Sequence, residues 1–150
     1  MGSIFLSKIS LWKRSGRILI LLILFGVTLF PFANGFGCDF YEEIDDAYRK
    51  VFSRCEHGII DRVIYNKKTG LSRKVKGIYA KKGTYFFIFL LDTEDITGPS
   101  KKELWVINLM TGRRVITGHY FEGEKKSILA IASPYPITCI TTRYGRSGYI

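Results

Sequence analysis

Two histidines are the residues of this 150-residue chain best suited to acid–base chemistry. His57 follows Glu56 directly, and His119 lies near the end of a predicted strand. Imidazoles gain and lose protons near neutral pH, and a histidine pair among many cations suits phosphodiester cleavage. Nothing in the spacing brings His57, His119 and a carboxylate into one pocket, so a small basic exported hydrolase such as a ribonuclease is an alternative hypothesis only.

Other catalytic signatures are missing from the sequence. The chain contains no nucleophile elbow, no phosphate-binding glycine loop and no metalloprotease motif. The cysteines are not closely spaced as in a zinc site. We therefore assign no catalytic residue, no metal and no cofactor, and we expect a protein that is not an enzyme.

Basic residues come in pairs at predicted turns. The pairs are Lys67/Lys68, Lys81/Lys82, Lys101/Lys102, Arg113/Arg114 and Lys125/Lys126. Alternate turns of a meander emerge at the same end, and the turns of Lys81, Lys82, Arg113 and Arg114 contain no acid. These four residues are predicted to form a cationic cluster that contacts an anionic surface, such as lipid head groups or a cell-wall polymer. The alternative is that charged turns only keep the sheet soluble and protect its edges.

Three cysteines, Cys38, Cys55 and Cys139, allow one intramolecular disulfide at most. A helix over residues 39–55 would separate Cys38 from Cys55 by about 26 Å, far beyond the reach of a bridge. The predicted pair is therefore Cys55 with Cys139. Buried thiols that never oxidise are the alternative.

The elements that position these residues begin with an apolar leader. Residues 18–37 carry no charge, whereas the preceding residues include four cations and no acid. This order predicts that the N-terminus stays in the cytoplasm while the following chain crosses a membrane. Residues 1–35 are a signal peptide or signal anchor. Pro31 is expected to end the helix, and small residues before Phe36 suit cleavage there, whereas an uncleaved span would cover residues 18–33.

Residues 36–150 are predicted to form a single small α+β domain. An N-terminal amphipathic helix over residues 39–55 is expected, because Phe40, Ile44, Val51 and Cys55 recur at helical spacing. The helix would pack on an antiparallel meander of six to seven strands. The predicted strands cover residues 59–65, 71–80, 84–91, 104–109, 113–120, 128–132 and 137–142, and the apolar third one should be covered on both faces.

These features predict an extracytoplasmic location, either secreted or periplasmic, or membrane-anchored with the C-terminal domain outside the cytoplasm. The leading hypothesis is an exported, non-enzymatic binding or accessory protein of the cell envelope or extracellular space. A membrane-anchored accessory subunit of an envelope assembly is the second hypothesis. The sequence identifies no protein partner.

Overall fold

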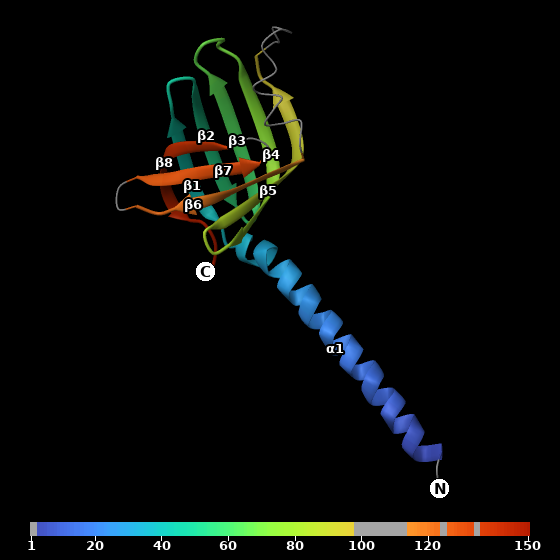
Figure 1. Cartoon of the computed structure of the whole chain (residues 1–150). Helices are drawn as coiled ribbons and strands as arrows, with labels where there is room; N and C mark the ends of the chain where they lie inside the picture. The colour runs from blue at the N-terminus through green and yellow to red at the C-terminus, as the bar shows by residue number, and fades with distance from the viewer. Residues whose placement is uncertain (1–2, 98–113, 124–125, 134–135) are drawn as a thin grey trace. The chain divides into compact units, whose positions relative to one another are not determined.

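A computed structural model describes residues 3–97, 114–123, 126–133 and 136–150 of the chain (Figure 1). The chain divides into two compact units, Met1–Pro31 and Phe32–Ile150. Each unit is described by itself.

The N-terminal element is one long helix, α1, over Ser3–Gly35. Its stretch Gly16–Gly35 has a mean hydropathy of 2.2 and is long and apolar enough to cross a membrane. The helix continues through Pro31, so the predicted break at this residue is wrong. A proline removes one backbone hydrogen bond, and membrane-type helices tolerate that loss where other groups compensate.

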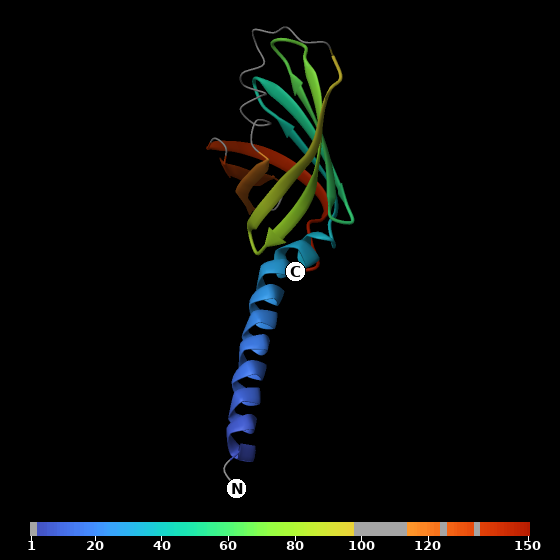
Figure 2. The same ribbon diagram turned by 90° about the vertical axis from the view of Figure 1, so that its right-hand side faces the viewer.

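The second unit contains eight strands that form a closed barrel (Figures 1 and 2). Every strand pairs antiparallel with the next, and β8 pairs with β1 to close the sheet. Closure leaves the sheet without a free edge. The strands are β1 (Asp39–Asp45), β2 (Arg49–Glu56), β3 (Ile59–Asn66), β4 (Ser72–Lys82), β5 (Tyr85–Asp95), β6 (Val115–Phe121), β7 (Ser127–Ser133) and β8 (Ile137–Arg146).

The prediction of antiparallel strands from residue 59 onward is confirmed. β3 to β8 cover six of the seven predicted strands, and the predicted strand 104–109 lies outside the described residues. The α+β class is corrected to an N-terminal helix followed by an eight-stranded barrel. The chain after the leader begins with a hairpin where the sequence predicted a packed helix.

Residues 39–56 form the β1–β2 hairpin, so the predicted helix over 39–55 is wrong. Phe40 and Ile44 are four residues apart, as are Val51 and Cys55, and a spacing of four fits both a helical stripe and one face of a strand. Within β1 and β2 the buried positions alternate strictly with exposed or half-exposed ones. Polar residues at some of these buried positions concealed the alternation in the sequence.

The hairpin also corrects the disulfide. Cys38 is bonded to Cys55, with 5.7 Å between their Cα atoms, and Cys139 is a free, buried thiol. The predicted Cys55–Cys139 pair is wrong because it assumed a rigid helix between Cys38 and Cys55. A hairpin folds the same segment back on itself, and Phe40 lies directly opposite Cys55.

The interior of the barrel is filled by inward-facing side chains from all eight strands. In β5, Phe86 and Ile88 face inward and are buried, whereas Phe87 and Phe89 on the other face are only partly covered. The predicted coverage of this strand on both faces is therefore wrong for most of its length. Phe32, the first residue of the barrel unit, packs on Phe89 with 5.4 Å between ring centroids.

Candidate functional site

Charged side chains lie inside the barrel, where alternation would normally place apolar residues. A row of directly opposed residues crosses four neighbouring strands: Arg143 on β8, Glu42 on β1, Ser53 on β2 and Arg62 on β3. Residues opposed in this way point to the same face of the sheet. All four side chains are buried or nearly so, with only 1% of Glu42 and 7% of Arg143 exposed. We call these four residues the arginine cluster.

Hydrogen bonds connect the arginine cluster from end to end. Arg143 Nη2 donates to Glu42 Oε1 at 2.9 Å, and Arg62 Nη2 lies 3.5 Å from Glu42 Oε2. Arg62 Nε donates to Ser53 Oγ at 2.9 Å. One carboxylate therefore serves two buried guanidinium groups.

Aromatic rings cover the Arg143 guanidinium. Its central carbon lies 3.6 Å from the ring centroid of Tyr120 and 4.2 Å from that of Phe40. Cation–π attraction of this kind strengthens when the cation is removed from water. Tyr79 packs edge-on against Phe40, and burial raises the pKa of Tyr79 to about 12. The tyrosine hydroxyl therefore stays protonated at neutral pH.

The arginine cluster carries more positive than negative charge. Burial lowers the pKa of Arg62, and the neighbouring Arg143 and Arg49 lower it further, against the attraction of Glu42. Burial also lowers the pKa of Arg143, but its closer contact with Glu42, together with Tyr79 and Tyr120, outweighs burial and raises it. Among the residues that the structure describes, no acceptor bonds the buried Nε and Nη1 of Arg143. The Arg143 guanidinium therefore has two donor atoms without a hydrogen-bond partner among the described side chains.

The free cysteine lies beside a further arginine. Arg49 Nη2 is 3.0 Å from Cys139 Sγ, and Arg49 Nε is 2.8 Å from the Asp46 carboxylate. Burial raises the pKa of Cys139, although Arg49 opposes this shift. The thiol is therefore a poor nucleophile at neutral pH, since the thiolate is the reactive form.

Asn34 joins three separate segments of the barrel unit. It is 4% exposed, and its Nδ2 donates to Lys81 O at 3.1 Å and to Ile150 O at 3.0 Å. Its Oδ1 accepts hydrogen bonds from the amides of Tyr149 and Ile150, both at 2.9 Å. The next residue, Gly35, is held so closely that a Cβ atom there would lie 2.2 Å from Tyr79 O. Residues 34 and 35 are therefore an integral part of the folded barrel.

Replacing Asn34 with Ala should destabilise the barrel by about 1–3 kcal/mol, because the change removes four part-buried hydrogen bonds. Thermal unfolding followed by circular dichroism measures this effect. Asn66→Ala is the matched control, since Asn66 Oδ1 caps the amides of Lys68 and Thr69 in a surface turn that water can also reach. An equal loss in both variants would contradict the joining role of Asn34.

The two histidines are far from forming a catalytic pair. His57 occupies the β2–β3 turn with φ +49°, and 83% of its side chain is exposed. His119 lies on the outer face of β6, between Tyr85 and Phe121, at centroid distances of 3.9 and 5.9 Å. No contact joins the two imidazoles within the described part of the chain.

Three of the four residues of the predicted cationic cluster lie in the described part of the chain. Lys81 and Lys82 end β4 beside the turn to β5, and Lys82 is paired with Tyr85. Arg114 precedes β6, and its carbonyl accepts a hydrogen bond from Leu90, five positions further along β5 than Tyr85. Arg113 lies outside the described residues. The single cluster of four residues therefore stays a prediction.

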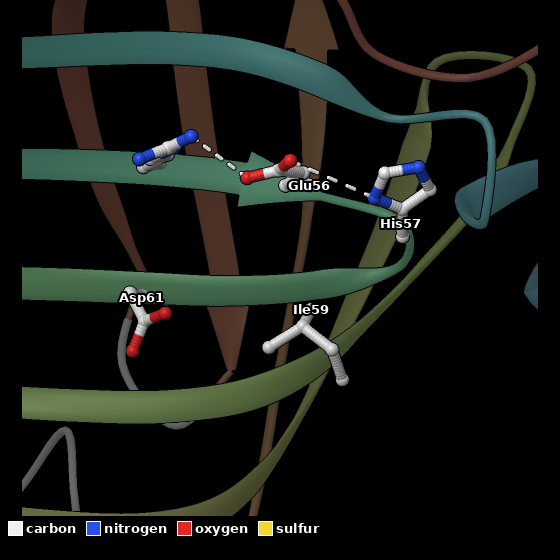
Figure 3. Close-up of a pocket in the computed structure, with 5 residues that line it drawn as sticks. Glu56, His57, Ile59 and Asp61 are labelled. Atoms are coloured by element: carbon white, nitrogen blue, oxygen red, sulfur yellow. Dashed lines mark hydrogen bonds and ion pairs between the residues drawn. The ribbon is translucent and has the colours of Figure 1, made fainter.

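A surface pocket beside the β2–β3 turn is shown in Figure 3. It has a volume of about 230 Å³ and is lined by Arg54, Glu56, His57, Ile59 and Asp61. Arg54 Nη2 lies 2.7 Å from one oxygen of the Glu56 carboxylate, and His57 Nδ1 lies 3.8 Å from the other. Both oxygens of this carboxylate therefore already have a neighbouring group. The pocket is smaller than the ~300–1,000 Å³ typical of ligand sites, and we do not assign a ligand to it.

No protein-family model matches the chain, and no curated protein is significantly similar to it in sequence. The function is therefore argued from the residues and their geometry.

Proposed function

We propose that this protein is a membrane-anchored, non-enzymatic accessory or binding protein that displays a disulfide-stabilised barrel outside the cytoplasm. One observation carries the proposal: the last residues of the apolar helix are also structural residues of the barrel. Asn34 and Gly35 end α1, and both are packed within the unit Phe32–Ile150. The helix α1 and the barrel unit therefore overlap in sequence at residues 32–35.

Cleavage before Phe36 would remove part of the barrel. The released chain would lack Asn34 and its four hydrogen bonds, and it would lack Phe32, which covers Phe89. A signal peptide is normally dispensable for the fold of the mature protein. The contacts of residues 32–35 thus favour a retained anchor over a cleaved signal.

Two further features support an outward-facing barrel. Residues 1–17 contain Lys8, Lys13, Arg14 and Arg17 without an acid, which favours a cytoplasmic N-terminus. The Cys38–Cys55 disulfide fits an oxidising compartment, because thiols in the cytosol are kept reduced.

The binding role rests on the chemistry of the described side chains. Guanidinium groups, protonated tyrosines and a buried thiol of raised pKa bind and position other groups, but they do not supply an acid–base pair. The arginine cluster also gives the barrel a specific polar interior, whose charge excess suits a negative group.

Full-length protein purified from native membranes is the test of this proposal. We expect an intact mass that includes the leader, residues 1–35, resistance to alkaline carbonate extraction, and digestion of the barrel by protease added from outside the cell. A mature N-terminus at Phe36 in a soluble fraction would instead identify a released protein and would overturn the anchoring part of the proposal. Protection of the barrel from external protease would overturn its location.

A further inference from the structure

The contacts around residues 34–37 create a surface of defined composition, which we call the barrel base. It consists of Phe36, Lys81, Lys82, Arg146 and Tyr149. Asn34 bonds the carbonyl of Lys81 and the amide of Tyr149, and Arg146 Nε donates to Gly37 O at 3.1 Å. All of these contacts lie within the barrel unit.

Chain connectivity fixes where the barrel base lies if α1 crosses a membrane. Asn34 and Gly35 are the final residues of the apolar stretch Gly16–Gly35. Groups that bond directly to Asn34 are therefore about 3 Å from the end of the span. The polar head-group layer on each side of the hydrocarbon is roughly 5–8 Å thick, which a lysine side chain can cross. Chain connectivity alone would therefore keep the barrel base within reach of the head groups.

The side chains of the barrel base match those of a membrane interface. Phe36 and Tyr149 are 58% and 65% exposed, although large aromatic rings normally avoid water. Aromatic residues at this depth and lysines beside them are typical of interfacial anchors. Tyr149 also packs against Arg146, whose guanidinium carbon lies 5.6 Å from the ring centroid.

The charges of the barrel base indicate which class of lipid it would bind. The barrel base carries the cations Lys81, Lys82 and Arg146, while the acid closest in register is Asp39, directly opposite Arg146 in the β1–β8 pairing. Glu56, opposite Asp39 on β2, is held by Arg54 at 2.7 Å. Lys81 Nζ donates to Ile150 O at 3.3 Å, and no ion pair joins Lys81 or Lys82 to a side-chain carboxylate among the described residues.

We propose that the barrel base binds the phosphate groups of anionic phospholipids through Lys81 and Lys82, with Phe36 and Tyr149 inserted among the head groups. This inference rests on the proposed retention of the anchor. It retains two of the four lysines and arginines predicted from the sequence to contact an anionic surface, and it leaves out Arg113 and Arg114.

Native mass spectrometry of the full-length protein, released from nanodiscs of equal phosphatidylglycerol and phosphatidylcholine, tests the proposal. The wild-type protein should retain phosphatidylglycerol in several-fold excess over phosphatidylcholine, since one lysine near an anionic surface corresponds to about a fivefold preference. Lys81→Glu/Lys82→Glu should reduce this excess to near parity. Lys74→Glu/Lys76→Glu, with the same charge change on exposed residues of the same strand, should keep the wild-type excess.

An equal loss of preference in both variants would overturn the proposal, because it would reflect net charge alone. Equal retention of the two lipids by the wild-type protein would overturn it as well. Lys82→Glu alone, at an exposed residue, provides the same comparison if the double variant does not fold. Every variant is reconstituted as the full-length chain, which includes the helix α1. Lipid preference is therefore measured independently of whether the helix is cleaved in native membranes.

Discussion

Replacing Glu42 with Gln should lower the free energy of unfolding of the barrel by about 3–5 kcal/mol, which corresponds to a fall of roughly 10 °C or more in the midpoint of thermal unfolding. Glu42 is the carboxylate that the described structure places between Arg62 and Arg143. The amide keeps the shape of the side chain but removes its charge and directs N–H donors at guanidinium N–H groups. Two buried cations then remain without a counter-charge.

Glu43→Gln is the matched control for this change. Glu43 is the next residue in β1, but it faces outward, its side chain is 44% exposed, and it pairs with Lys50 at 2.9 Å. Surface ion pairs contribute little because water screens them. The thermal midpoint of this variant should stay close to that of the wild-type protein. Similar losses in the two variants would contradict a special role for the buried carboxylate.

The double variant Glu42→Gln/Arg143→Met separates charge imbalance from lost packing. Removing both partners of a buried pair is often far less costly than removing one. The double variant should therefore be more stable than the sum of its single changes predicts, as measured by a double-mutant cycle. Strict additivity would show that Glu42 and Arg143 are not coupled.

Local sequence patterns predicted most of the strands but not the closure of the barrel. The segments from Ile59 onward are rich in β-branched and aromatic residues and are separated by clear turns, so their periodicity was informative. Closure depends on the pairing of β1 with β8, for example Ile44 opposite Thr141. These two strands are neighbours in the barrel but lie near opposite ends of its sequence. No local pattern encodes such a distant pairing. The wrong prediction of a helix over residues 39–55 also hid the closure, because β1 and β2, which complete the sheet, were not recognised as strands.

The arginine cluster was missed for a related reason. Glu42 lies between the buried Phe40 and Ile44, and Arg62 lies between the buried Ile60 and Ile64. A charged residue at an inward position of an alternating strand is the signal that could have revealed the cluster. Reading residues 39–55 as a helix placed Glu42 on a solvated face, where its charge needed no explanation.

Removing the Cys38–Cys55 disulfide, by Cys38→Ser/Cys55→Ser, should cost about 3 kcal/mol, the expected value for a closed loop of this size. The two cysteines are 17 residues apart, and the bridge joins the residue before β1 to β2. Both cysteines are almost fully buried, so the serine hydroxyl groups add a desolvation cost. Thermal unfolding with and without a reducing agent measures the effect.

Cys139→Ser is the control that decides between the two possible pairings. If Cys38 bonds Cys55, a reducing agent should destabilise the wild-type protein and Cys139→Ser to a similar extent, while Cys38→Ser/Cys55→Ser should not respond. If Cys55 were bonded to Cys139 instead, Cys139→Ser would itself lose its sensitivity to reduction. The hairpin register predicts the first result, because the pairing of Phe40 with Cys55 places Cys38 within bonding distance of Cys55, with 5.7 Å between the two Cα atoms. The disulfide therefore requires only the local β1–β2 hairpin.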